Sequence, residues 1–458
     1  MMRRSQFIRL FYLFLLGLGL GNCDNNSSKS TKPSREVSNE LRIWWHRGFY
    51  PEESEAIEKI VANWKQNTGI AVRLTFISDR DVVGELKNAL SQGNPPDIFF
   101  SETADLTIVP HLAWNNQLVD VSEILEYLKD SYSENALKSV YYSNKVDKKR
   151  SYYAVPIMQR TVHLHYWKDL IATVGQTKES IPSDWQRFWQ FWGEVQSSLR
   201  ASRNPDIYAM GLPMSFSTDT FDIFEHFLEA YNYKPLDEFG EPLLDAPLIV
   251  KTVTAALEKY ASFYQQQQVP PEALNWTNAD NNVSFLSRNS LMSANPTLSI
   301  PGSQRNNKQV YAEEIATIIW PKKPNGDPMK SITSIKQVII LEASDKQQAA
   351  KNFLSYLAQP QNLQAYTKGS QGRFFPVMPK LLEDPFWQDS TDPHITVALK
   401  QFEQTRLPYQ VLNPAYSEVL SDNIWAKAIQ KILLDGLSPE VAAKQAIEKI
   451  ENIWDKWK

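Results

Sequence analysis

The sequence predicts an α/β protein with open, mixed or parallel sheets that carry helices on both faces. Within the first hundred residues, short apolar runs typical of buried strands alternate with segments of helical periodicity, in the order strand, helix, strand, helix, strand. Such alternation gives parallel strands, because each helix carries the chain back across the sheet. A length of 458 residues also exceeds what one small domain needs, so we expect more than one folded unit.

The first elements can be located from the signals at their ends. Residues 41–45, LRIWW, are an apolar and aromatic run suited to a buried strand. A helix follows, with Pro51 in its first turn, acidic residues next to it, and Gly69 just beyond its end. The alternation continues with a strand over 71–78, a helix over 82–90 and a strand over 97–100.

Later segments show the same two periodicities without an internal repeat. The apolar spacing predicts strand character at 152–167, 208–214, 283–300 and 314–328, a strand and then a helix at 336–359, and helices at 183–199 and 438–457. The helix at 183–199 is rich in tryptophan. The C-terminal part of the chain is expected to be mostly helical.

The strand order also selects candidate ligand contacts. Open parallel sheets bind ligands beyond the carboxyl ends of their strands. The residues that follow the three predicted strands are Trp45 and His46, then Ser78 and Asp79, and then Ser101, Glu102 and Thr103. Adjacent strand residues point to opposite faces, so only one of Trp44 and Trp45 can face the ligand side.

Composition and motifs exclude several functions. The 48 basic and 52 acidic residues give a net charge of -4, which supplies no basic field for nucleic acid. The one cysteine rules out an internal disulfide and a site with several cysteine ligands. His163 and His165 share a strand face, but no third histidine or cysteine lies near them in sequence, so we expect no metal and no cofactor. The nucleophile-elbow, zinc-protease, P-loop and dinucleotide motifs are also absent.

The N-terminus has the features of an export signal. Three arginines precede an uncharged apolar run over residues 10–21, which is shorter than the ~20 residues that span a bilayer. Cys23 follows this run and resembles the lipidated cysteine of bacterial lipoproteins, although Asn22 stands where a small residue is usual. We expect a lipoprotein signal peptide over 1–22 and a lipid-anchored flexible tether over 23–39.

A series of motifs then gives the body of the chain a family likeness. These motifs lie at 92–98 (QGNPPDI), 153–156 (YAVP), 166–170 (YWKDL), 182–185 (PSDW), 320–326 (WPKKPNG), 349–354 (AAKNFL) and 436–440 (GLSPE). In their order and spacing, the chain resembles the extracellular solute-binding proteins of family 1, the maltose-binding-protein-like sugar receptors of ATP-binding-cassette (ABC) importers.

The resemblance implies a two-lobe periplasmic-binding-protein fold of type II with a hinged cleft. The expected first lobe comprises 40–157 and 325–375, the expected second lobe comprises 158–324 and 376–440, and residues 441–458 form a C-terminal helix that packs on the lobes. Closure of the hinge around a ligand would couple the cleft to the surface that meets a permease.

The expected ligand contacts combine this cleft with aromatic rings suited to the apolar faces of sugars. They are Trp45, His46, Asp79, Ser101, Glu102, Arg160, Asp219, Trp276, Asn295, Arg373, Phe374 and Trp425. Arg160 stands where maltose-specific members of the family carry an acidic residue, which argues against maltose itself. A pairing of Glu102 with Arg160 across the cleft is a further expectation.

The sequence thus predicts a lipid-anchored, extracytoplasmic binding protein that captures a small carbohydrate and delivers it to an ABC permease. It would act as a monomer, without enzymatic activity, in the periplasm or at the cell surface. Two alternatives remain at this point. A secreted glycoside hydrolase could use carboxylates such as Glu102 and Asp219. A binding lipoprotein of the same fold could take a non-sugar solute or serve a membrane sensor.

Overall fold

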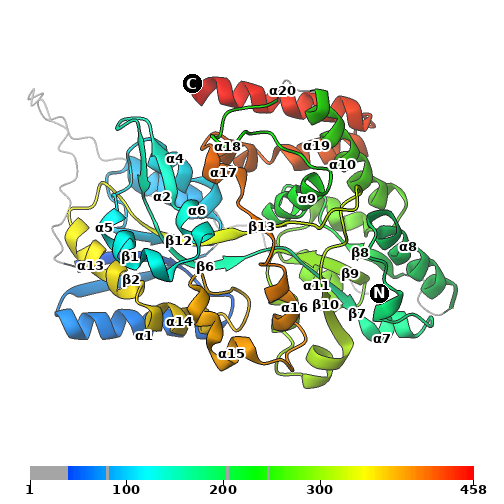
Figure 1. Ribbon diagram of the computed structural model, residues 1–458, viewed down its shortest axis with the longest axis horizontal. Coiled ribbons are helices and arrows are strands. Elements are labelled where there is room, and N and C mark those ends of the chain that lie inside the picture. The colour runs from blue at the N-terminus through cyan, green and yellow to red at the C-terminus, as the bar shows by residue number, and fades with distance from the viewer. Residues whose placement is uncertain (1–39, 79–81, 203–205, 245–246, 458) are drawn as a thin grey trace, which may run out of the picture. The chain divides into compact units, whose positions relative to one another are not determined.

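The computed structural model describes residues 40–78, 82–202, 206–244 and 247–457. Cys23, the predicted signal and tether, and Asp79 lie outside the described residues. Two main sheets and a large set of helices make up the described part of the chain (Figure 1).

The first sheet contains the N-terminal strands in the predicted parallel arrangement. Its order is β2-β1-β3-β12-β6. The strands are β1 (Glu40–His46), β2 (Ala71–Ile77), β3 (Ile98–Phe100), β12 (Ser334–Ile340) and β6 (Val155–Arg160). β1 pairs in parallel with β2 and β3, whereas β12 is antiparallel to both β3 and β6. The sheet is therefore mixed.

Helix α1 (Pro51–Thr68) has the end residues that predicted it from the sequence. Proline occupies its first turn, Glu52 and Glu53 follow, and Gly69 ends the helix in the left-handed conformation with φ of 71°. Its apolar positions face the sheet and are buried, among them Ile57 and Trp64. The helices α2 (Val82–Ser91), α13 (Gln347–Leu357) and α14 (Pro360–Gly369) belong to the same part of the fold.

The second sheet has the order β10-β7-β9-β8. Its strands are β7 (His163–Trp167), β8 (Tyr208–Gly211), β9 (Ser290–Asn295) and β10 (Ile315–Ile318). β7 is antiparallel to β9 and β10, while β8 is parallel to β9. Its main helices are α8 (Trp185–Ser202), α9 (Thr218–Ala230), α10 (Pro247–Gln265) and α11 (Asp280–Leu286).

Shorter elements connect and cover the sheets. The helices are α3 (Ala104–Thr107), α4 (Val109–Trp114), α5 (Ser122–Leu128), α6 (Glu134–Ser139), α7 (Lys168–Ala172), α12 (Ser299–Gly302), α15 (Pro385–Gln388), α16 (Ile395–Lys400), α17 (Tyr409–Leu412), α18 (Tyr416–Ser421) and α19 (Ile424–Leu433). The remaining strands pair as β4 (Tyr141–Asn144) with β5 (Lys149–Tyr152), and β11 (Ser331–Ile332) with β13 (Thr405–Arg406).

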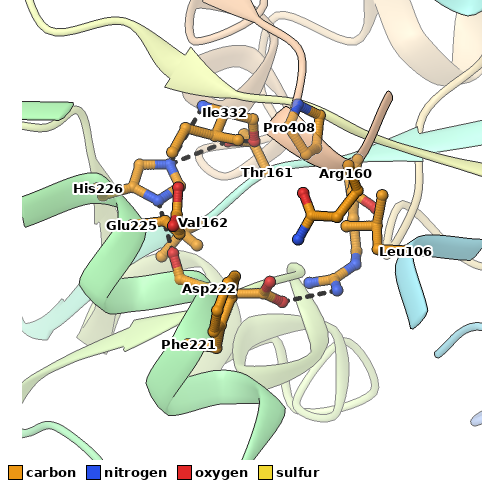
Figure 2. Close-up of a pocket in the computed structure, with 12 residues that line it drawn as sticks. Leu106, Arg160, Thr161, Val162, Phe221, Asp222, Glu225, His226, Ile332 and Pro408 are labelled. Carbon is orange, nitrogen blue, oxygen red and sulfur yellow. Dashed lines mark hydrogen bonds and ion pairs between the residues drawn. The ribbon is translucent and has the colours of Figure 1, made fainter. Parts of the chain in front are cut away.

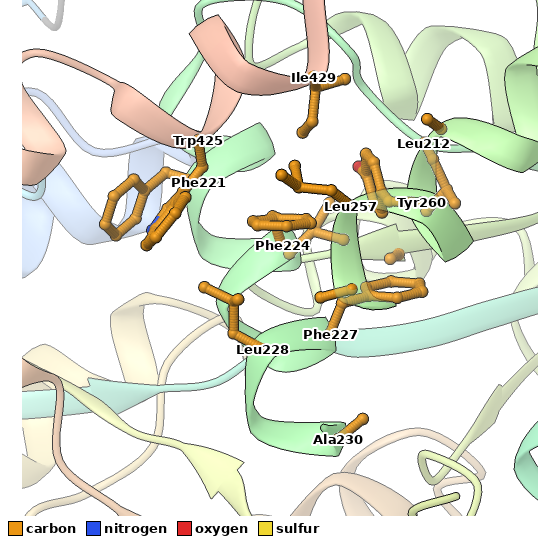
Figure 3. Packing of buried hydrophobic residues seen from close by; sticks show 14 of the residues in the cluster. Leu212, Phe221, Phe224, Phe227, Leu228, Ala230, Leu257, Tyr260, Trp425 and Ile429 are labelled. Carbon is orange, nitrogen blue, oxygen red and sulfur yellow. The ribbon is translucent and has the colours of Figure 1, made fainter. Parts of the chain in front are cut away.

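Each sheet has its own apolar core. The first core surrounds the first sheet and includes Trp64 and Phe353. The second core surrounds the second sheet and is dense in aromatic rings from α8, α9 and α10. Figure 3 shows Phe224, Phe227 and Tyr260 of this core packed together, with Trp425 from α19 beside them. Two separate cores are the physical basis of a two-lobe fold.

The chain passes between the two sheets more than once. It leaves the first sheet at the end of β6 and enters the second at β7, only two residues later. It returns between β10 and β12. The boundary expected after residue 157 falls inside β6, because the whole of this strand pairs with β12 up to Arg160.

The C-terminal helix α20 (Pro439–Trp457) packs mainly on α10 and α19 (Figure 1). Its buried residues, such as Ile450 and Trp454, belong to the second core. Its last turn also reaches α4 next to the first sheet, where the Trp457 ring lies 5.2 Å from His111 and 6.0 Å from Trp114.

Candidate functional site

A cleft of about 460 Å³ opens where the ends of the strands of both sheets meet. This volume is within the range of small-molecule sites. Its walls come from the segments that follow β1, β2, β3 and β9 and from the starts of α9 and α11. The lining residues are His46, Arg47, Gly48, Phe49, Ser78, Glu102, Thr103, Arg160, Thr218, Asp219, Asn278, Ala279, Asn282, Asn295, Pro296, Thr297, Ser299 and Arg373.

Arg373 organises the charged wall next to the first sheet. Its Nε and Nη2 bind the two carboxylate oxygens of Glu53 at 2.9 and 2.7 Å, and its Nη1 binds Glu102 Oε2 at 2.8 Å. His46 Nδ1 lies 3.2 Å from Glu102 Oε1. Glu53 comes from the first turn of α1 and is buried behind the cleft. The arginine thus holds one carboxylate in the interior and presents the other to the cleft.

The charged side chains in this wall keep one another ionised by shifting the pKa values of Glu102 and Arg373. Burial raises the pKa of Glu102, but Arg373 and His46 outweigh it and hold the pKa of this carboxyl well below its usual value. Burial alone would lower the pKa of Arg373, and the two carboxylates raise it well above the ordinary arginine value. Glu102 is therefore a permanent hydrogen-bond acceptor at neutral pH.

Arg160 does not pair with Glu102, so that expectation was wrong. Its Nη2 binds Asp222 Oδ2 at 2.7 Å instead (Figure 2), and its Nη1 donates to the Pro296 carbonyl at 3.4 Å. Each carboxylate finds a nearer arginine: Asp222 on α9 faces Arg160, and Glu102 faces Arg373. Each of these two arginines is thus paired with a carboxylate of its own.

Arg160 also borders a second, very small cavity at the crossing between the sheets. This cavity of about 20 Å³ has room for a single water molecule. Thr161 and His226 line it, and both contact β11: Thr161 Oγ1 donates to the Ile332 carbonyl at 2.9 Å, and His226 Nε2 accepts from the Ile332 amide at 3.3 Å (Figure 2). These bonds tie the two crossing segments together.

The wall next to the second sheet is rich in amides and hydroxyls. Asn295 Nδ2 donates to Asn282 Oδ1, and Asn282 Nδ2 donates to Ser299 Oγ at 3.0 Å. Asp219 lies in the first turn of α9, where its backbone amide donates to Asn278 Oδ1 at 3.2 Å. Because these side chains hold one another in place, they form a pre-oriented set of donors and acceptors.

The aromatic residues chosen from the sequence lie in the cores and do not line the cleft. Trp45 is fully buried and donates its indole N–H to Tyr366 Oη at 2.9 Å. Trp425 is also fully buried and donates to Glu225 Oε1 at 3.0 Å. Phe374 packs in the first core and Trp276 in the second. Their large apolar surfaces are buried by packing, which corrects the expectation that they are ligand platforms.

Phe49 is the aromatic ring among the described residues that line the cleft, and sequence reasoning missed it. Its side chain is 53% exposed and packs edge-on against Tyr50. The available signal was its place in the loop after the first strand, the same strand exit that selected His46.

Six of the twelve expected ligand contacts line this cleft: His46, Glu102, Arg160, Asp219, Asn295 and Arg373. Ser78 and Thr103, which the strand order also selected, line it as well. Ser101 is buried behind the wall, where its Oγ accepts from the Thr103 amide at 3.2 Å. Asp79 lies outside the described residues. Residues missed from the sequence include Arg47, Asn278, Asn282, Thr297 and Ser299, which lie in loops or helix ends without a distinctive motif.

No group of three or more His, Cys, Asp or Glu side chains in the described part of the chain could hold a metal ion. The rings of His163 and His165 are 6.4 Å apart and away from the cleft. His163 Nδ1 bonds to Gln401 at 2.8 Å, and His165 Nδ1 bonds to Thr317 at 3.0 Å. Within the described ranges, no helix combines the length and apolarity needed to cross a membrane.

Two cores, repeated crossings and a polar cleft at the strand ends define a two-lobe solute-binding protein. Residues 59–396, well over half of the chain, match the model of a family described as bacterial extracellular solute-binding protein. The chain belongs to this family. The family resemblance and the fold class predicted from the sequence are therefore confirmed. No curated protein sequence matched the chain.

Solved structures share the fold at low sequence identity. A solute-binding protein of an ABC transporter from Thermotoga lettingae, bound with α-D-tagatose, is 20% identical with a TM-score of 0.74, covering 91% of this chain and 100% of its own. Maltose-bound MalE3 of T. maritima is 17% identical with a TM-score of 0.72, and the match covers 90% of this chain and 99% of MalE3. A sugar transporter protein from Arthrobacter chlorophenolicus with bound laminaribiose is 14% identical with a TM-score of 0.70, and the match covers 90% of this chain and 99% of its own. The match over nearly the whole of each chain establishes the two-lobe fold.

Proposed function

We propose that the protein captures a small neutral carbohydrate in the cleft and delivers it to the permease of an ABC importer. The observation that carries this proposal is the pre-oriented polar lining. One wall offers the ionised Glu102, and the other offers Asn282, Asn295 and Ser299. Donors and acceptors on both sides, with the exposed ring of Phe49, match the hydroxyls and apolar faces of a sugar.

The charge balance of the cleft favours a neutral ligand. Arg373 is paired with Glu53 and Glu102, and Arg160 is paired with Asp222. An ionic ligand would have to compete with these carboxylates for the same guanidinium groups. Arg47 and Asp219, which also line the cleft, carry opposite charges. The structural neighbours named with tagatose, maltose and laminaribiose support the same class of ligand.

The chemistry of the cleft favours binding over hydrolysis. A glycoside hydrolase needs one carboxylic acid that is protonated at working pH, which requires a raised pKa. Arg373 and His46 hold the pKa of Glu102 well below its usual value, so this carboxyl cannot donate a proton near neutrality. Glu102 is thus excluded as the acid, and together with the match to a solute-binding family this supports our proposal that the protein has no hydrolase activity.

Lobe boundaries and anchoring complete the proposal. The first lobe would extend through β6 to residue 160 and resume at 325–375, and residues 161–324 and 376–440 would form the second lobe, with α20 packed mainly on the latter.

Lipidation of Cys23 would hold a monomer at the outer face of the cytoplasmic membrane. Fractionation tests this last point: Cys23→Ser should move the protein from the membrane fraction to the soluble fraction, and unchanged membrane association would refute lipid anchoring through this residue.

A thermal-shift screen tests the ligand class. The purified protein is heated with monosaccharides, disaccharides, a sugar acid, amino acids and polyamines, and thin-layer chromatography follows each sugar for cleavage. A ligand that binds only the folded state raises the melting temperature with concentration. We expect stabilisation by a neutral sugar without new products. Stabilisation only by an amino acid, a polyamine or the sugar acid would reject the neutral-sugar proposal, and cleavage products would reject the binding-only function.

A further inference from the structure

Two segments that belong to different cores meet beside the cleft. Residues 50–52 begin α1, which packs on the first core through Ile57 and Trp64. Residues 299–305 follow β9 of the second sheet, where Ile300 packs with Trp167 at the end of β7 and with Ile315 of β10. Contacts between these segments are therefore contacts between the two halves of the fold.

Arg305 makes most of this contact. Its Nη2 binds Glu52 Oε1 at 2.7 Å, and its guanidinium carbon lies 4.2 Å from the centre of the Tyr50 ring. Its Nη1 also donates to the Gly302 carbonyl at 3.2 Å, which fixes the side chain on its own segment. The ion pair and the cation–π contact thus act together on one pre-oriented arginine.

The Tyr50 side chain packs against the backbone of the second segment at Ser299 and Gly302. Tyr50 Oη donates to the Ser299 carbonyl at 3.3 Å, and the tyrosine is buried. A Cβ atom at position 302 would lie 2.5 Å from Tyr50 Oη, which is closer than non-bonded atoms allow. A side chain at position 302 would therefore displace the tyrosine hydroxyl.

We propose that Tyr50, Glu52, Gly302 and Arg305 form a clasp that stabilises the closed cleft, whether or not solute is bound. None of the four lines the cleft. Opening of the lobes must break the ion pair, the cation–π contact and the tyrosine hydrogen bond. The clasp therefore sets the fraction of closed molecules and, if the proposed function holds, the affinity and residence time of the solute, because apparent affinity scales with that fraction.

The distance between the lobes tests the clasp without a ligand. Cys23→Ser removes the one cysteine of the chain. Two new cysteines, Ser91→Cys in α2 and Ser197→Cys in α8, then carry the two spin labels. Pulsed dipolar spectroscopy then gives the distribution of open and closed molecules in the full chain. We expect the closed-to-open ratio to fall about threefold to tenfold in Arg305→Ala, Glu52→Ala and Gly302→Ala.

Two controls separate the clasp from a general effect. In the double variant Glu52→Ala with Arg305→Ala, the closed-to-open ratio should fall by less than the two single effects combined, since both substitutions remove the same ion pair. Arg73→Ala breaks a comparable pair, 2.8 Å to Glu40, within the first sheet and should leave the ratio unchanged. A wild-type distribution without a closed population, or one that Arg305→Ala and Gly302→Ala leave unchanged, would overturn the proposal.

A sugar titration separates this inference from the proposed function. With any neutral sugar that stabilises the protein, Arg305→Ala should weaken binding about threefold to tenfold, in parallel with its effect on the closed fraction. If no sugar binds, the proposed function fails and the distance measurement still decides on the clasp. A variant that opens the lobes but binds the sugar with unchanged affinity would refute the control of affinity by the clasp.

Discussion

At the scale of single residues, Arg373 has the most connected side chain of the cleft. It joins Glu53 from α1 to Glu102 after β3; Arg373 and Glu53 are buried, and Glu102 borders the cleft. Removal of one partner from a buried ionic group leaves uncompensated charge in the interior. Arg373→Met should therefore destabilise the protein by about 3 to 5 kcal/mol in urea denaturation. A loss below about 1 kcal/mol would contradict this account of the charged wall.

Buried histidines should make stability depend on pH. Burial lowers the pKa of His163 to about 3 and those of His226 and His394 to about 4, whereas an unfolded histidine has a pKa near 6.5. As the pH falls below about 6.5, the unfolded chain gains protons that the folded protein excludes, so stability declines until the folded pKa is reached. Each group contributes up to about 1.4 kcal/mol per pH unit in this window.

The variant His163→Gln isolates this effect from the acidic residues. It removes one proton-binding group and keeps a side chain that can bond with Gln401. Urea denaturation between pH 7 and pH 5 should show a shallower loss of stability in the variant than in the wild type. An identical pH slope in the two proteins would contradict the assignment of His163 as a neutral, buried group.

At the scale of elements, α8 shows what the tryptophan-rich helix is for. Trp189 is buried between α9 and α10, with ring centres 5.1 Å from both Phe227 and Phe263. Trp189→Ala should cost about 3 to 5 kcal/mol, the range for large-to-small changes of buried aromatic residues. Trp189→Phe should cost less, because the indole N–H has no hydrogen-bond partner among the described residues.

Circular dichroism during urea denaturation measures both variants, since fluorescence would change with the loss of the indole itself. Tyr127→Ala is the control, because that side chain is exposed on α5 and should change stability by less than about 0.5 kcal/mol. Equal losses for Trp189→Ala and Trp189→Phe would show that the indole N–H, and not the ring volume, carries the effect.

The elements also show which parts of the fold follow from local sequence. The first three strands and α1 were predictable because strand runs, helix end signals and apolar spacing all lie within a few residues. The insertion of β12 between β3 and β6 was not, because pairing over more than 170 residues leaves no local pattern. The mixed character of the sheet follows from that long-range pairing.

At the scale of the whole molecule, the cleft exists because two cores meet where their strands end. The rule for strand exits led to His46 and Glu102, which line the cleft. The same reasoning failed for Trp45 and Trp425, because a tryptophan gains most by full burial and sequence alone does not say which core receives it. Asn278 and Asn282 in the other wall could not be predicted, since isolated amides in loops carry no sequence pattern.

The central claim is that this cleft binds a neutral sugar through its two polar walls. Isothermal titration calorimetry with the sugar that gives the largest thermal shift tests it most directly. We predict one saturable site in the wild type. Asn295→Ala should weaken binding at least about tenfold, because an oriented amide in the wall is lost. The control Asn88→Ala changes an exposed asparagine on α2 and should keep the wild-type affinity. Equal affinity in Asn295→Ala and Asn88→Ala, or no neutral sugar that binds, would contradict the account.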